Sequence, residues 1–338
     1  MDMYSPILSD CSKTDRTTRK DGTMNIISKQ RPLRLKSGIW PRVKKAKYLY
    51  LLLLIPIIYV FIFNYTPMYG VIMAFKKFTP SQGIMGSAWV GLYNFQRFFS
   101  SPECLNIIWN TVRLSLYGLI AGFPFPIILA VALNYCKFSP LKKSVQSITF
   151  MPYFLSAVLM VGLMTQVLGT RSGIVNYVIT LLGLEPINFM GNAAVFDHVY
   201  VWSGIWQGTG YSAIIYISAL SGVDPSYHEA AMIDGASIWQ RIWHIDLTTI
   251  RPTVVILLIL NIGSILNIGF EKIYLMQNPL NTSVSSIIST YVYGVSLKAA
   301  QPDYSFGTAI GLFQNGVAVI LTLIVNWVAN RITGDGLF

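Results

Sequence analysis

His228 and Glu229 stand side by side in a polar stretch of an otherwise apolar chain, and together they form half of a zinc-protease pattern. In the full pattern a second histidine follows the first by four residues and completes the metal site. Met232 occupies that position here. We therefore expect neither a metal site nor hydrolytic chemistry in this stretch.

Two other patterns typical of enzymes are incomplete. Gly208-Thr209-Gly210 imitates the start of a dinucleotide-binding loop, but it lies in an apolar run with no preceding strand, so close helix packing is the better interpretation. The sequence has no Gly-Lys-Ser/Thr phosphate loop. No nucleophile lies beside a base in a pattern that we can identify. The sequence predicts that this chain is not an enzyme and binds no cofactor of its own.

The polar stretch 221–251 favours a pair of short helices. Asp224 is a suitable N-cap and Pro225 suits the first helical position. Gly235 is a natural helix end, and 236–245 can form a second helix.

The first of these short helices is amphipathic. It carries the charges of Glu229 and Asp234 beside a small apolar face made of Ala230, Ala231, Met232 and, from the second helix, Ile238. Such a helix suits docking into a groove on a soluble partner. The alternative is a helix that lies in the lipid interface, but such helices usually carry Lys and Arg on their polar face.

Polar and aromatic side chains recur in three of the apolar runs, where they are costly unless they line a cavity or bond to another helix. Either interpretation fits any one of them, but three successive runs carrying such groups favour a substrate pathway that they line. The residues are Trp206, Gln207, Tyr211, Asn261, Ser264, Asn267, Gln314 and Asn315.

The elements that position these residues are predicted to be membrane helices. Hydrophobic residues make up 53% of the 338 residues and charged residues 12%, whereas a soluble domain carries about 25% charged residues. Long apolar runs alternate with short polar pieces, which is typical of helices that cross a bilayer. We expect an all-α integral membrane protein, a bundle of six transmembrane helices at 48–65, 107–135, 144–168, 197–220, 252–276 and 306–329.

The placement of charge predicts the topology. The net charge is +11, and twelve of the 25 Lys and Arg residues precede Tyr48. Positive charge beside a first span marks the cytoplasmic side, so both termini are expected there, with a basic tail at 1–47 and a transmembrane domain at 48–338. The tail ends directly at an apolar helix, so we expect no nucleic-acid partner. It has no pattern of a cleavable signal, and Met24 is an alternative start.

A secondary transporter or channel for a polar solute is one functional class that a bundle of membrane helices could serve, and we keep it as an alternative. Coupling to protons usually leaves carboxylates within the spans. Glu271 is the one obvious candidate, and we expect it to form a boundary ion pair with Lys272, although Lys272 could instead contact an acidic sugar. A membrane structural protein is the third alternative.

One motif resembles a known family. Glu229-Ala230-Ala231, Gly235 and Ile245-x-Leu247 occur at the spacing of the EAA loop of bacterial ABC importer permeases. The family pattern continues Leu-Pro, whereas Leu247 precedes Thr248 here and the proline follows at Pro252. Further segments resemble the oligosaccharide and polysaccharide branch, with aldouronate and alginate permeases most similar; they lie at 67–70, 89–92, 123–130, 150–156, 291–293 and 309–313.

The resemblance implies a six-helix permease of the type I importer fold in the bacterial cytoplasmic (inner) membrane. It implies four partners: a second permease, two ATPase subunits that carry ATP and Mg and dock at the EAA loop, an extracytoplasmic substrate-binding protein, and a sugar. The residues it assigns to ATPase coupling are Glu229, Ala230, Ala231, Asp234, Gly235, Ile245 and Leu247. Glu229 would meet a basic residue of the ATPase, and Gly235 would permit the bend between the two short helices.

Overall fold

The structure is a computed structural model that describes residues 46–334, so most of the predicted basic tail lies outside the described residues. The chain divides after Phe61 into two units. The described part of the first unit is helix α2 (Lys47–Val60), in which every side chain is exposed. A helix that is apolar all round suits lipid as its surroundings.

The second unit is almost entirely helical. Within residues 46–334 its one sheet pairs β1 (Lys76–Lys77) with β2 (Ala88–Trp89) as antiparallel strands, with Lys76 opposite Trp89. Its elements, in chain order, are η1 (Phe61–Tyr65, which begins in the first unit), α3 (Thr66–Met68), η2 (Tyr69–Phe75), β1 (Lys76–Lys77), α4 (Gly83–Gly86), β2 (Ala88–Trp89), α5 (Tyr93–Phe99), α6 (Cys104–Gly122), α7 (Pro124–Tyr135), α8 (Ser139–Phe150), η3 (Met151–Phe154), α9 (Ala157–Val167), α10 (Ile174–Leu181), α11 (Ala193–Leu220), α12 (Pro225–Ile233), α13 (Ile238–Arg241), η4 (Ile242–Asp246), α14 (Leu247–Gly263), α15 (Phe270–Met276), α16 (Thr282–Ser285), α17 (Ile288–Tyr293), η5 (Gly294–Lys298) and α18 (Tyr304–Thr333).

Within residues 46–334, four helices are long and apolar enough to cross a membrane: Lys47–Phe75, Cys104–Tyr135, Ile238–Gly263 and Tyr304–Arg331. A fifth candidate is the bent pair Ser139–Phe154 and Ala157–Val167. The predicted span at 197–220 corresponds to α11, which has 28 residues but is not among these candidates. Its many Gly, Ser, Thr, Tyr and Gln residues lower its hydropathy.

Two predicted spans are not straight helices. The span expected at 144–168 bends by 105° between η3 and α9. Pro152 begins that bend, and Ser156 caps the new helix by accepting a hydrogen bond from the amide of Leu159 at 3.3 Å. The span expected at 252–276 is broken at 264–269, where α14 ends and α15 has not begun. Its helix starts well before Pro252, which lies inside α14.

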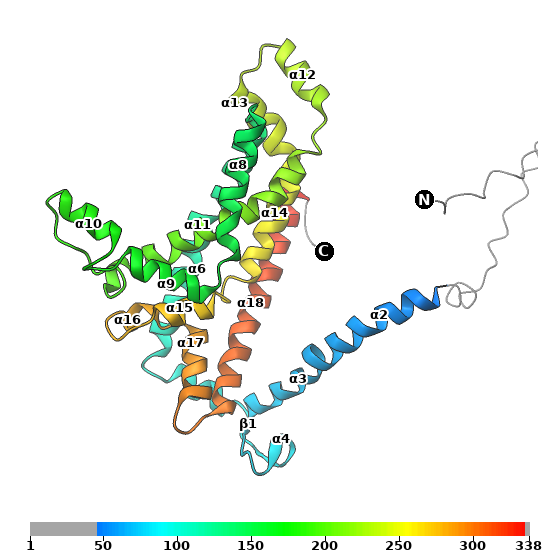
Figure 1. Ribbon diagram of the computed structural model, residues 1–338. Helices are drawn as coiled ribbons and strands as arrows, with labels where there is room; N and C mark the ends of the chain where they lie inside the picture. Colours follow the sequence, from blue (N-terminus) through cyan, green and yellow to red (C-terminus); the bar gives the residue numbers. More distant parts are fainter. Residues whose placement is uncertain (1–45, 335–338) are drawn as a thin grey trace, which may run out of the picture. The chain divides into compact units, whose positions relative to one another are not determined.

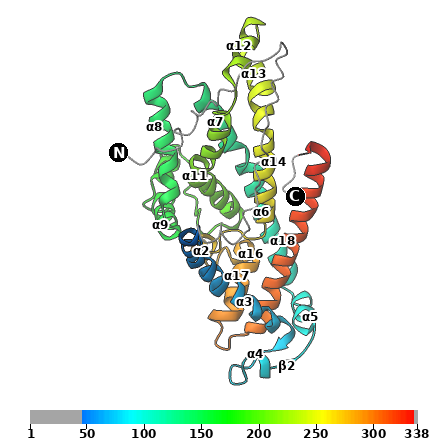
Figure 2. The ribbon, with the colours of Figure 1, turned by 90° about the vertical axis from the view of Figure 1, so that its right-hand side faces the viewer.

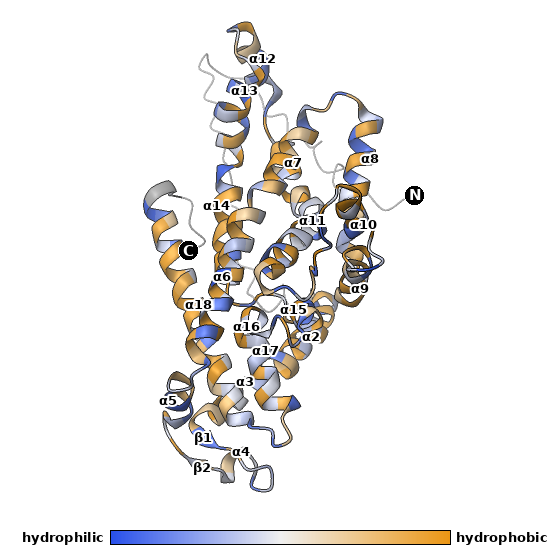
Figure 3. Ribbon diagram, turned by 90° about the vertical axis from the view of Figure 1, so that its left-hand side faces the viewer, coloured by the Kyte–Doolittle hydropathy of each residue, from blue (hydrophilic) through white to orange (hydrophobic). Residues whose placement is uncertain are grey.

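Helix α11 lies at the centre of the second unit and packs against α6, α7, α8 and α14. Helix α18 packs against α14, η2, α5 and α17. Figures 1 and 2 show α12 and α13 at one end of this unit and α4 with the short sheet at the other. Apolar residues run along α14 and α18 in Figure 3, as expected for helices whose outer faces meet lipid.

Candidate functional site

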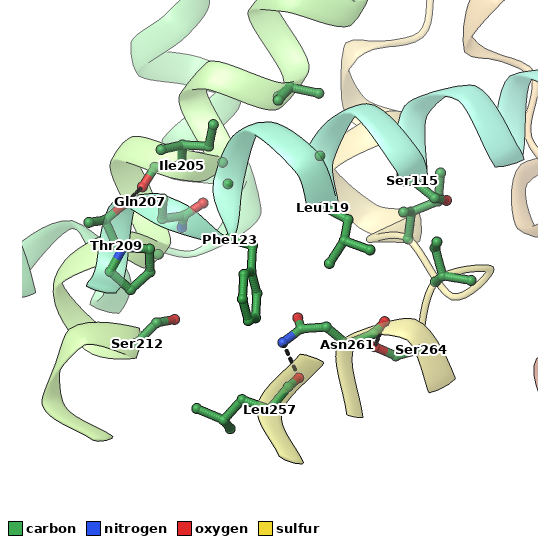
Figure 4. Close-up of a pocket in the computed structure, with 18 of the residues that line it drawn as sticks. Ser115, Leu119, Phe123, Ile205, Gln207, Thr209, Ser212, Leu257, Asn261 and Ser264 are labelled. Atoms are coloured by element: carbon green, nitrogen blue, oxygen red, sulfur yellow. Dashed lines mark hydrogen bonds between the residues drawn. The ribbon is translucent and has the colours of Figure 1, made fainter. Parts of the chain in front are cut away.

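A cavity of about 420 Å³ lies among α6, α7, α11, α14 and α15. This volume is within the range of about 300–1,000 Å³ that is typical of small-molecule sites. Figure 4 shows Gln207 and Thr209 of α11 on its walls, together with Asn261 of α14 and Ser264 just beyond the end of that helix, with Phe123 between them. Its polar lining residues are Ser115, Tyr200, Gln207, Thr209, Ser212, Tyr216, Asn261, Ser264 and Lys272.

The break between α14 and α15 opens onto this cavity. Ser264, Ile265 and Ile268, all within or at the edge of the non-helical segment, line it. Irregular backbone at membrane depth is stable only where it is buried in protein or lines a cavity, because lipid offers no hydrogen-bonding partner. Discontinuous helices of this kind are a common feature of transporter binding sites. The break therefore forms part of the cavity wall.

Three of the predicted pathway residues line the cavity together. Gln207 donates a hydrogen bond to the carbonyl oxygen of Leu155 at 2.9 Å, and Asn261 donates one to the carbonyl oxygen of Leu257 at 2.7 Å (Figure 4). Ser264 bonds within its own helix end. These bonds hold each side chain in place on the wall.

The other predicted pathway residues lie elsewhere. Gln314 is buried, donates to Oδ1 of Asn267 at 3.1 Å, and lines a smaller cavity of about 290 Å³ beside α17 and η5. Tyr211 stacks on the ring of Tyr153 at a centroid distance of 3.8 Å. Tyr211, Asn267, Asn315 and Trp206, which is 55% exposed, line neither cavity.

Lys272 is the cation of the larger cavity. Its side chain is half-buried, its Nζ donates to the carbonyl oxygen of Tyr200 at 3.2 Å, and the same Nζ lies 5.1 Å from the centroid of the Tyr200 ring. None of the ion pairs among residues 46–334 includes it, and Glu271 is exposed, so the predicted boundary pair is not formed. The charged end of Lys272 therefore faces the cavity without a carboxylate.

The short helix α12 has the ends that the sequence predicted. Asp224 accepts a hydrogen bond from the amide of Ser226 at 2.9 Å, and this bond lowers the pKa of Asp224. Gly235 has a φ of 77°, and its amide donates a hydrogen bond to the carbonyl oxygen of Met232. The amide of Ala236 donates to the carbonyl oxygen of Ala231. These two bonds form a Schellman motif, which explains the glycine.

The predicted coupling residues of α12 face outward. Glu229, Ala230, Asp234 and Gly235 are exposed and Ala231 is half-buried. The surface around them is apolar and includes the exposed side chains Tyr227, Met232, Ile233, Ile238, Trp239 and Trp243.

The second short helix was predicted to end at Ile245, and this prediction is wrong. Instead α13, η4 and α14 follow one another from Ile238 to Gly263 without a break, and Ile245 and Leu247 are half-buried within them. Ser237 and Gln240 form a capping box at the start of α13. The helix that begins with α13 is therefore continuous with α14.

Comparisons with known proteins agree with this architecture. Residues 122–334 match the family described as binding-protein-dependent transport system inner membrane component. The chain is 40% identical over 296 residues to protein LplB of Bacillus subtilis (strain 168), covering 88% of this chain and 92% of that protein. It is 41% identical over 294 residues to the polygalacturonan/rhamnogalacturonan transport system permease protein YteP of the same organism, covering 87% and 91%.

A solved structure also matches. One chain of the bacterial alginate ABC transporter, crystallised in complex with an alginate pentasaccharide-bound periplasmic protein, is 36% identical, with a TM-score of 0.81. The match covers 88% of this chain and 99% of that chain.

Proposed function

This chain belongs to the family of binding-protein-dependent transport system inner membrane components, and we propose that it is a permease subunit of an ATP-driven importer for an acidic oligo- or polysaccharide. It is a multi-pass membrane protein that works as a transport subunit rather than an enzyme. The sequence left a secondary transporter or channel open as an alternative, and membership of this family argues against both.

The observation that carries the substrate class is Lys272 in the cavity. A cation that is half-buried and has no carboxylate partner is costly unless a ligand supplies the negative charge. The surrounding Gln207, Asn261 and Ser264 offer hydrogen bonds, and Phe123 and Tyr200 offer ring faces. A sugar that carries a carboxylate would satisfy all three kinds of group. The relatives named for polygalacturonan/rhamnogalacturonan and alginate transport support the same class.

The exposed surface of α12 and α13 supports a docking role toward the ATPase subunits. Tyr227, Met232 and Ile233 form an apolar patch, and Glu229 supplies a charge beside it. We propose that each of two ATPase subunits receives such a helix from one permease of a pair, and that ATP and Mg bind to the ATPases. In this arrangement the end of the unit with α12 faces the cytoplasm.

The remaining parts of the proposal concern topology and the outer partner. We propose six spans, with α11 and the broken α14–α15 pair each counted as one and both termini cytoplasmic. The end of the unit with α4 and the short sheet would then face outward, toward an extracytoplasmic substrate-binding protein. The setting is the cytoplasmic membrane of a bacterium, and the basic tail at 1–47 lies on its inner side.

The test is sugar-dependent ATP hydrolysis in a reconstituted complex that contains the second permease, the ATPases and the binding protein. Oligogalacturonate and oligoalginate are compared with a neutral maltooligosaccharide of the same length. We expect hydrolysis and uptake to be stimulated by at least one of the acidic sugars. Stimulation by the neutral sugar alone would overturn the acidic class, and uptake without ATP hydrolysis would overturn the importer.

A further inference from the structure

A buried carboxylate lies at the base of the coupling helix α12. Asp246, the last residue of the π turn η4, has an exposed fraction of 0%. Tyr135 donates its hydroxyl to Oδ2 of Asp246 at 2.7 Å, and Nε2 of His228 lies 3.3 Å from Oδ1. The ring of His228 also packs edge-on against the ring of Tyr135, with centroids 6.4 Å apart.

These three residues come from three separate elements. His228 is on α12, Tyr135 is the last residue of α7, and Asp246 stands immediately before α14. Helix α7 packs against α11, and α11 and α14 both line the larger cavity. One carboxylate therefore joins the exposed helix to two of the helices that lead to the cavity.

The cluster also contains two buried polar atoms without a hydrogen bond. One is Oδ1 of Asp246 and the other is Nε of Arg241, whose guanidinium lies 5.9 Å from the centroid of the Tyr135 ring. Oδ1 of Asp246 has the imidazole of His228 3.3 Å away but no hydrogen bond, and a buried polar atom without a hydrogen bond is costly. A rearrangement that brought Oδ1 of Asp246 and Nε of Arg241 together would give each of these two atoms a hydrogen-bonding partner.

The π turn explains why Arg241 and Asp246 share this cluster. In η4 the amide of Leu247 bonds to the carbonyl of Ile242, five residues back. This wider turn changes which side chains align along the helix, and such turns are frequent at functional sites. If the turn tightened into an ordinary α-helical turn, Asp246 would rotate relative to Tyr135 and His228.

We propose that Asp246 is the positioning residue that transmits movement of α12 to the cavity helices α7 and α14, through Tyr135 and His228. The proposal rests on the proposed function, because it assigns a route for the force that the ATPases apply. Docking at the surface of α12 and transmission through the buried cluster are separate properties of separate residues. Loss of the cluster leaves the ATPases bound and working but separates their cycle from sugar movement.

The experiment measures sugar imported per ATP hydrolysed in the full reconstituted complex. The variants are Asp246→Asn, Tyr135→Phe and His228→Asn. His244→Asn is the matched control, because His244 lies on the same segment, is exposed, and contacts only the carbonyl of Gln240. Co-purification of the ATPases reports assembly.

For Asp246→Asn and Tyr135→Phe we expect a fall of about tenfold in sugar imported per ATP, a size typical of coupling between sites. In both variants we expect co-purification of the ATPases and basal ATP hydrolysis to stay at the wild-type value. In His244→Asn we expect the ratio of sugar imported to ATP hydrolysed to stay at the wild-type value. A purely structural role would lower assembly and hydrolysis along with uptake. Tyr135→Phe removes only one hydroxyl group. If the Asp246→Asn protein does not accumulate, the ratio of sugar imported to ATP hydrolysed in Tyr135→Phe tests the proposal alone.

If the wild-type complex imports sugar and the ratio of sugar imported to ATP hydrolysed is unchanged in Tyr135→Phe and Asp246→Asn, the inference is overturned and the proposed function is not. Loss of assembly in both variants would overturn it as well, because the cluster would then serve stability. A wild-type complex that imports none of the sugars would overturn the proposed function first and this inference with it. The three results are distinguishable in the same set of measurements.

Discussion

Nε of Arg113 lies 2.8 Å from Oδ2 of Asp197, and this ion pair joins α6 to α11 across 84 positions of sequence. Both side chains are partly shielded, with exposed fractions of 30% and 18%. We expect Asp197→Ala to lower the free energy of unfolding by about 1–3 kcal/mol, because it leaves the guanidinium unpaired. Thermal unfolding of the detergent-solubilised protein measures this.

The double variant Arg113→Ala/Asp197→Ala is the control for this pair. It removes both charges, so it should be less destabilised than the sum of the two single changes. Simple additivity would mean that the ion pair contributes nothing to holding α6 against α11.

At Gly210, helix α11 packs closely against the C-terminal end of α8. A methyl group there would overlap the backbone of Thr149 and Phe150, whereas one at Gly208 would meet no atom within 4 Å. We therefore expect Gly210→Ala to separate the helices and cost about 1–3 kcal/mol, as overpacking does. Gly208→Ala should leave the unfolding temperature unchanged. Equal unfolding temperatures for the two variants would contradict the close packing at Gly210.

The charge of Lys272 should determine which sugars enter. Lys272→Met removes the charge and keeps an unbranched side chain, so we expect uptake of an acidic oligosaccharide to fall about tenfold or more, the effect of losing a charged hydrogen bond. Uptake of any neutral sugar that the complex carries should change little. Lys272→Arg keeps the charge and should retain part of the acidic-sugar uptake. Equal losses for both sugar classes would show a structural role instead.

Gly235 and Glu229 should affect docking. Gly235→Ala places a side chain at a φ of 77°, which costs roughly 1–2 kcal/mol for a residue other than glycine. We expect less ATPase to co-purify with Gly235→Ala and with Glu229→Ala. Gly316→Ala is the matched control, because Gly316 is helical, exposed, and has open space around it. If the ATPase co-purifies normally with both Gly235→Ala and Glu229→Ala, α12 is not part of the docking surface.

The sequence predicted the ends of α12 from chemistry that acts within a few residues. Asp224 caps its own next turn, and Gly235 adopts a backbone conformation that other residues avoid. The same local reasoning located the apolar segments. It missed the bend before Ser156 and the break at 264–269, because a polar or proline-containing segment inside an apolar run is stable only when other helices supply its partners.

The pathway residues divide for a geometric reason. Gln207 lines the cavity while its neighbour Trp206 points away, since successive residues of an α-helix are about 100° apart around its axis. Composition identified α11 and α14 as helices that carry polar groups. It did not give their rotation, which depends on how they pack against α6 and α7.

Amino-acid order by itself determined that this chain lies in a membrane, where most of its apolar helices lie, and that 221–251 carries a capped helix. Hydropathy, charge placement and capping act locally, so they can be read without a fold. Only the tertiary structure decided that Lys272 lies against Tyr200 and that Tyr135 bonds to Asp246. Those contacts join residues 72 and 111 positions apart, and their formation depends on the packing of whole helices.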